Sequence, residues 1–211
     1  MRFAFIPWVV LSTAAVASGE VKVPCSCEES QEPAEAIETV SRDISLAAHA
    51  QAESLESMTG SITLRRDSRV TGDVETGNGA LVLEPGSEVA GDLSNDTGMI
   101  RIDGAHVGGR VSTTNGDIHV GADSRVDGGI LVHTRNVIGL SFFDLKLGVP
   151  VGRSTPPRVI IGPRATVAGV LRFKRKVELL VSESATIGPV DGATPVMFAT
   201  EEPPPPTAIK D

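Results

Sequence analysis

The chain is poor in aromatic residues: its 211 residues include six phenylalanines, one tryptophan and no tyrosine. Any core must therefore be aliphatic, and few flat rings are present on which sugars or bases could stack. Cationic residues are outnumbered as well, with 19 Lys and Arg against 27 Asp and Glu and a formal net charge of −8. Counterion release and phosphate attraction cannot drive binding for such a chain, so we expect no nucleic acid and no anionic membrane surface as a partner.

A segment of about 20 uninterrupted apolar residues, the length that spans a bilayer, is missing after the first residues of the chain. The shorter apolar stretch 3–11 follows Arg2 and leads to Ala15-Val16-Ala17, an A-x-A cleavage pattern before Ser18. The sequence predicts a signal peptide, no transmembrane segment, and a mature protein that is periplasmic or secreted.

Cysteine is limited to Cys25 and Cys27, a few residues into the predicted mature chain. The two are too close in sequence for an easy bridge, so a strained bond, an intermolecular bond and free thiols all remain open. Lipidation at Cys25 is disfavoured because Lys22 and Pro24 stand where a lipoprotein signal has small apolar residues. The pair lacks further ligands nearby, so we expect no metal there and no cofactor.

One short pattern is written four times between Gly60 and Val132. Each unit begins with two apolar residues separated by one residue. After a short polar stretch it continues with the pattern apolar-x-Gly-x-apolar. The opening residues are Ile62, Leu81, Ile100 and Ile118, in steps of 19, 19 and 18, and the closing glycines Gly60, Gly79, Gly98 and Gly116 repeat these steps. A fixed period of this size indicates a stacked array.

Alternation within each unit determines the kind of array. Apolar residues occur at every second position of each short segment, so their side chains all point to the same face, which we expect to be the inner one. Val, Ile and Leu at these positions favour β-strands. Such units bury that side only by stacking, each strand pairing in parallel with its copy in the next coil. The glycines are predicted at corners where backbones approach closely, because no helical periodicity follows them as a phosphate-binding loop would need. The expected fold is an all-β, single-stranded parallel β-solenoid of about six to seven coils of 18–20 residues.

The remaining segments are assigned around this array. The pattern returns as Val159-x-Ile161 and Leu179-x-Val181, and Ile44-x-Leu46 predicts a degenerate first coil. The predicted organisation is a signal peptide at 1–17, an acidic N-terminal arm or cap at 18–41, the solenoid at 42–193 with an insertion at 133–157, and a proline-rich disordered tail at 194–211.

The insertion is the most apolar segment outside the repeats. Exposed as a loop, it would present a candidate interaction surface at Phe142, Phe143, Leu145 and Leu147. The alternative is an extra hairpin that folds back and covers one side of the solenoid, and we favour it because large apolar residues are usually buried.

Two segments carry a family resemblance. The run Thr114-Asn115-Gly116-Asp117-Ile118-His119-Val120 resembles the bacterial adhesin domains built from β-strand repeats, and Val159–Gly169 resembles the bactofilins, polymer-forming bacterial cytoskeletal proteins. The resemblance covers about residues 42–193 and implies a right-handed β-helix, end-to-end or lateral assembly, and no catalytic activity. Bactofilins act on the cytoplasmic side, whereas this chain carries an export signal, so the cytoskeletal role is not carried over.

Two classes of solenoid enzyme are the alternatives. Left-handed acyltransferases keep strict hexapeptide repeats, and positions 161, 167, 173, 179 and 185 step by six, but the earlier coils do not. Polysaccharide lyases and hydrolases cluster acids on one sheet face, and Asp73, Asp92 and Asp117 recur beside the repeat glycines. Acids at repeated corners are more often solubilising residues. None of the histidines His49, His106, His119 and His133 has metal-ligand spacing with another within one element, and we expect them at the surface.

The predicted function is a non-enzymatic, exported, structural or adhesive element of a bacterial cell envelope, without catalytic, cofactor or metal residues. The alternative is a carbohydrate-active or acyl-transfer enzyme on the same scaffold. The partner is expected to be a second copy, or an envelope protein or glycan. Prolines near both ends of the array cannot extend a ladder, so we expect a monomer or small oligomer rather than a filament.

Export gives the first test. The mature chain should begin near Ser18 and carry no lipid, because Ala15-Val16-Ala17 fits the signal peptidase and the residues before Cys25 do not fit a lipoprotein signal. Intact-mass analysis of the envelope fraction measures both properties. An added diacylglyceryl mass on Cys25 would instead make the protein an anchored lipoprotein.

Overall fold

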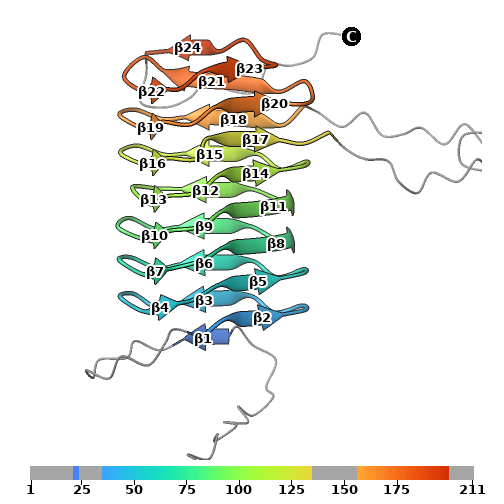
Figure 1. Cartoon of the computed structure of the whole chain (residues 1–211), viewed down its shortest axis with the longest axis vertical. Coiled ribbons are helices and arrows are strands. Elements are labelled where there is room, and N and C mark those ends of the chain that lie inside the picture. The colour runs from blue at the N-terminus through green and yellow to red at the C-terminus, as the bar shows by residue number, and fades with distance from the viewer. Residues whose placement is uncertain (1–20, 24–34, 135–155, 200–211) are drawn as a thin grey trace, which may run out of the picture.

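The computed structural model describes residues 21–23, 35–134 and 156–199, and in these ranges the chain is built of short β-strands joined by tight turns. The strands form three parallel sheets that stack as about seven coils (Figure 1). Each complete coil contributes one strand to each sheet, and the turn that follows carries the chain to the next sheet. The predicted all-β parallel solenoid is confirmed.

The three sheets are named A, B and C. Sheet A contains, in spatial order, β1 (Val21–Val23), β3 (Ile44–Leu46), β6 (Ile62–Leu64), β9 (Leu81–Leu83), β12 (Ile100–Ile102), β15 (Ile118–Val120), β18 (Arg158–Ile161), β21 (Glu178–Ser182) and β24 (Val196–Phe198). Sheet B contains β2 (Ile37–Thr39), β5 (Leu55–Ser57), β8 (Val74–Asn78), β11 (Leu93–Thr97), β14 (Val111–Thr113), β17 (Ile130–Val132), β20 (Leu171–Phe173) and β23 (Val190–Asp191). Sheet C contains β4 (Gln51–Ala52), β7 (Arg69–Val70), β10 (Glu88–Val89), β13 (His106–Val107), β16 (Arg125–Val126), β19 (Thr166–Val167) and β22 (Thr186–Ile187).

The core is a set of aliphatic rows that run along the stack. In sheet C the row is one valine per coil from β7 to β19, with Ala52 and Ile187 at its two ends, and each valine is completely buried: Val70, Val89, Val107, Val126 and Val167. The sequence predicted this row because each valine stands at the same place before its glycine. Sheet A contributes two further buried rows, which contain Ile62 with its copies and Leu64 with its copies.

A polar row lies inside sheet B, at its second inward position. Ser57, Thr76, Asn95 and Thr113 occupy it in consecutive coils, and all four are buried. Thr76 Oγ1 donates a hydrogen bond of 2.8 Å to the carbonyl oxygen of Gly60, and Asn95 Nδ2 donates one of 2.7 Å to that of Gly79. Burial is tolerated because these side chains satisfy the backbone groups of the corner.

The corner glycines permit this close packing. A Cβ atom at Gly79 would overlap the carbonyl oxygen of Gly60, and one at Gly116 would overlap that of Gly98. Successive corners therefore touch through their backbones, as the sequence predicted from the recurrence of glycine.

The stack extends beyond residues 42–193 at both ends. Strand β2 lies within the segment predicted as an arm, because Ile37-Glu38-Thr39 repeats the pattern of Leu55-Glu56-Ser57 and pairs with it in register. Strand β1 pairs with β3 and forms the end of sheet A. At the other end β24 pairs with β21 inside the segment predicted as a tail.

The register of the stack is the same before residue 135 and after residue 155. Strand β15 pairs with β18, and β17 pairs with β20, as if the chain were continuous. The guanidinium of Arg175 donates hydrogen bonds to the carbonyl oxygen of Thr114 at 3.1 Å and to Asn115 Oδ1 at 3.0 Å, which connects coils on the two sides of the insertion.

The valine row gives a prediction on stability. Val89→Asp should cost at least about 3 kcal/mol, since it places an uncompensated charge in the narrow core. The matched control is Val82→Asp, which makes the same change at an outward, half-buried position of β9. Thermal and urea unfolding of the two variants should differ strongly, and similar melting would contradict the register.

Candidate functional site

The candidate interaction residues Phe142, Phe143, Leu145 and Leu147 lie outside the described residues, so that prediction stands untested. Within the described part of the chain, no group of three or more His, Cys, Asp or Glu side chains is arranged to hold a metal ion. The described residues also contain no helix of the length and hydrophobicity that crossing a membrane requires.

The acids considered for catalysis stabilise the corners. Asp73 Oδ1 accepts the backbone N–H of Asp92, and Asp92 Oδ1 accepts that of Arg110, each at 2.7 Å. Asp117 Oδ1 accepts the N–H of Arg158 at 2.7 Å. Each carboxylate thus connects one coil to the next and supplies the acceptor that a backbone N–H at a corner needs. Asp73 and Asp92 lie between sheets C and B, whereas Asp117 precedes a strand of sheet A, so the three do not converge.

The outer row of sheet C balances its own charge. Arg69, Glu88, His106 and Arg125 are neighbours along it. Arg69 pairs with Glu88 at 2.6 Å, and Asp127 contacts His106 Nε2 at 2.9 Å and Arg125 at 2.7 Å. The hydrogen bond with His106, followed by that with Arg125, lowers the pKa of Asp127. This alternating row leaves little net charge to attract a partner.

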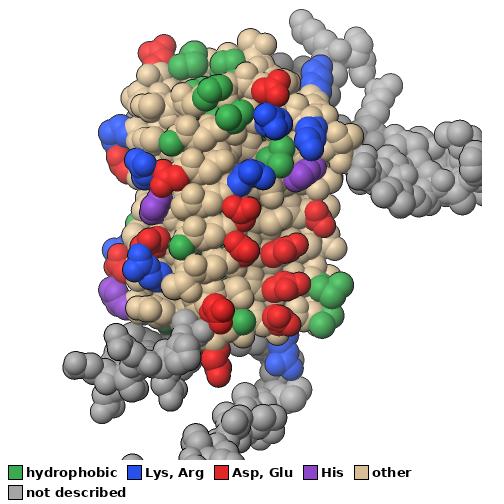
Figure 2. Space-filling model, in the orientation of Figure 1, with side chains coloured by type: hydrophobic (Ala, Val, Ile, Leu, Met, Phe, Trp, Pro, Cys, Tyr) green, Lys and Arg blue, Asp and Glu red, His purple; other side chains and the backbone are tan. Residues whose placement is uncertain are grey.

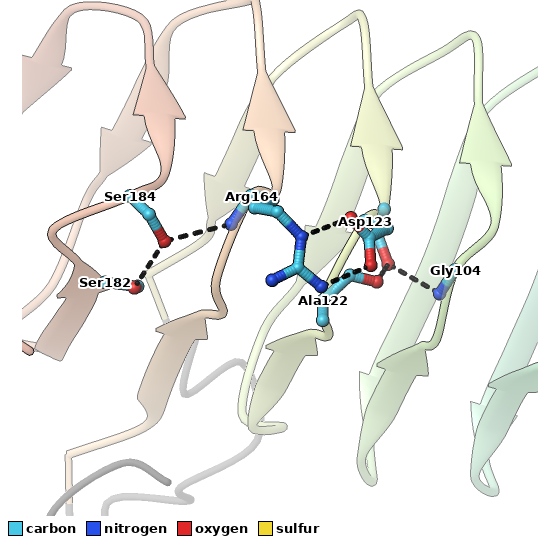
Figure 3. Close-up of polar contacts among 7 residues, drawn as sticks. Gly104, Ala122, Asp123, Arg164, Ser182 and Ser184 are labelled. Atoms are coloured by element: carbon cyan, nitrogen blue, oxygen red, sulfur yellow. Dashed lines mark hydrogen bonds and ion pairs between the residues drawn. The ribbon is translucent and has the colours of Figure 1, made fainter. Parts of the chain in front are cut away.

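Turn residues between sheets A and C form a second structural contact (Figure 3). Asp123 and Arg164 occupy equivalent turns, both with positive φ, and form a bidentate pair with two distances of 2.7 Å. The hydrogen bond from Arg164 lowers the pKa of Asp123. The backbone N–H of Arg164 also donates to Ser184 Oγ at 3.2 Å, so this cluster connects three consecutive coils.

The outer face of sheet A carries His119, whose pKa is displaced from its ordinary value. His119 lies outward between Arg101 and Ile160, as the alternation predicted. Partial burial lowers its pKa, Asp103 opposes this shift, and Arg101 adds to it. Burial therefore favours the neutral form of this imidazole.

Sheet B presents a face with a charge gradient. Its central outward row reads, from β2 to β23, Glu38, Glu56, Glu75, Ser94, Ser112, Leu131, Arg172 and Asp191. The next outward position on each strand is two residues further along, and this flanking row reads Val40, Met58, Gly77, Asp96, Thr114, His133 and Lys174. In the right half of the view in Figure 2, a group of acidic side chains lies at mid-height and below, and several Lys and Arg side chains lie above it.

The acidic end of this face is uncompensated. Within the described residues, Glu38, Glu56 and Glu75 form no ion pair, and all three are exposed. At the other end Arg172 pairs with Asp191 at 3.4 Å, while Lys174 and Lys176 are exposed. The acidic row was not predicted from the sequence, although Glu56 and Glu75 are 19 residues apart, one period of the repeat, and so occupy equivalent positions.

Comparisons of the chain with protein families, with curated proteins and with solved structures find no match. The solenoid fold is therefore shown by the structure, and the resemblance to adhesins and bactofilins remains an expectation from the sequence.

A structural role for the corner acids predicts how their variants behave. Asp92→Ala removes an acceptor and should cost about 1 kcal/mol, or a fall in Tm of roughly 2–4 °C, whereas Asp92→Asn keeps an oxygen at that place and should melt close to the parent. Glu53→Ala, which removes an exposed carboxylate, is the control. Equal effects of Asp92→Ala and Glu53→Ala in scanning calorimetry would argue against the structural role.

Proposed function

We propose that the chain is a non-enzymatic, exported β-solenoid that serves as a rigid structural or adhesive element of a bacterial cell envelope. The observation that carries the proposal is the use of the corner carboxylates. Four corner carboxylates each accept a hydrogen bond from a backbone N–H of the following coil: Asp43, Asp73, Asp92 and Asp117. These carboxylates hold neighbouring coils together.

The stacked coils support a mechanical role. Internal strands pair on both sides with copies of themselves, so bending the array would break backbone hydrogen bonds in all three sheets. At about 4.8 Å per coil, the seven or so coils make a short rod roughly 35 Å long. Such a rod holds its outer rows at fixed spacing, which suits repeated weak contacts with an extended partner such as a glycan or a second protein.

The leader and the composition agree with this location. The sequence pattern at 1–17 favours export, and the buried core of the described residues contains no cysteine. The resemblance to adhesin repeats and to bactofilins points to a structural function, without naming a ligand.

The test separates the structural proposal from the enzyme alternative. The full chain is produced in a bacterial host, and the cells are fractionated. We expect leaderless protein in the extracytoplasmic fraction, cosedimentation with isolated envelopes, and no release of reducing ends from sacculi or soluble polysaccharides. Retention of the intact leader in the cytoplasm would contradict the export proposal.

The matched variant carries Asp73→Asn, Asp92→Asn and Asp117→Asn, which keep the corner oxygens but remove the titratable groups. If the parent degraded a glycan and this variant, still folded by circular dichroism, did not, the enzyme alternative would replace the structural one.

A further inference from the structure

We infer that two copies of this chain associate face to face through the outer face of sheet B, with their stacking axes antiparallel. In this pair the acidic end of each copy covers the basic end of the other. The inference rests on the charge gradient along sheet B and does not depend on the proposed function.

The acidic end carries an electrostatic cost in the single chain. Glu38 lies directly beside Glu56, and Glu56 directly beside Glu75, in register on three neighbouring strands. Neighbouring strands are about 4.8 Å apart, and like charges at directly opposite positions destabilise a sheet. No basic side chain within the described residues forms an ion pair with them, so a cationic surface from outside would relieve the repulsion.

The basic end of the same face supplies that surface. Lys174 and Lys176 are exposed, and Arg172 is engaged only in an exposed pair with Asp191. An exposed pair of this kind contributes little and exchanges partners readily. Ser94 and Ser112 separate the two ends with short hydroxyl side chains, 3.2 Å apart, which allow a second surface to approach.

Symmetry selects the antiparallel arrangement. The proposed two-fold axis runs parallel to the strands and passes between Ser94 and Ser112. It places the central row of one copy against the central row of the other, in the opposite order, and does the same for the flanking rows. Glu56 then faces Arg172 of the second copy, and the reverse contact forms as well. Glu75 faces Leu131 and Glu38 faces Asp191, each one strand from that Arg172, so the arginine is the centre of the attraction. A parallel arrangement would set acid against acid, which is a strong penalty against that alternative.

Apolar groups add to the same contact. Val40 and Met58 are 68% and 60% exposed beside the acidic row. In the antiparallel pair Met58 lies against the flanking row that contains Lys174, whose aliphatic stem can pack on it while the ammonium reaches a carboxylate.

The size of the face limits the affinity. Eight strands about 4.8 Å apart span roughly 34 Å, and four residues along a strand span roughly 13 Å. The contact would bury about 450 Å² per copy and about 900 Å² in total, near the lower limit for a specific interface. We therefore expect a weak dimer that depends on charge and dissociates in salt.

The experiment is sedimentation velocity of the untagged mature protein over a concentration series. The parent should dimerise at about 0.1 M salt and become monomeric at about 1 M, where the Debye length falls from roughly 10 Å to 3 Å. Glu56→Lys with Glu75→Lys, and separately Arg172→Glu with Lys174→Glu, should each weaken dimerisation by about tenfold or more. An equimolar mixture of the two variants should restore it, because the first variant is basic at positions 56 and 172 and the second is acidic at both, so the facing positions again carry opposite charges.

The control is Glu84→Lys with Glu183→Lys, which changes the net charge as much as the first variant but lies on the turns between sheets A and C. This control should dimerise as the parent does. A parent that stays monomeric at low salt would overturn the inference. It would also be overturned if the mixture failed to associate, or if Phe142→Ser with Phe143→Ser abolished a dimer that the charge variants left intact.

Discussion

Everything in this structure depends on one constraint: each strand pairs in parallel with the strand one coil away. Parallel pairing places residue against residue at the same step of the repeat, so any side chain that fits the core in one coil must fit beside its copy in the next. Val70 beside Val89 and Ile62 beside Leu81 satisfy this with aliphatic groups of similar size. The thinness of the core follows, because only a few inward positions per coil are available.

The corners are where the constraint is hardest to meet, since the chain must turn without leaving backbone groups unpaired. Glycines bring successive corners into backbone contact, and the buried Thr76 and Asn95 donate to the glycine carbonyl groups. Carboxylates on the outside accept the N–H groups that the ladders leave free. Stacking of the coils therefore explains the positions of these polar residues as well as the positions of the valines.

These demands explain which features could be predicted from the sequence. Inward positions recur at a fixed step, so the fold, the valine row and the role of the glycines could be read directly. The end strands could not, because a terminal coil has a neighbour on one side only and tolerates residues such as Met197 that break the pattern. The inner polar row was also missed: Ser57, Thr76, Asn95 and Thr113 look like surface residues until their burial is known. Their burial depends on hydrogen bonds to backbone groups of the corners, which a reading of side chains alone does not include.

The outer rows are free of the stacking constraint, and for that reason they hold the information about partners. Sheet C uses this freedom to alternate charges, so that Arg69 and Glu88 compensate each other within one molecule. Sheet B does the opposite, since Glu38, Glu56 and Glu75 are adjacent in register and Arg172 and Lys174 lie several coils away. Sheets B and C have the same strand spacing, yet one separates its outward charges and the other alternates them. The fold itself therefore does not require the charge gradient on sheet B. A gradient that costs the single chain stability, and that becomes complementary only when the face is reversed against itself, is best explained by contact with a second molecule.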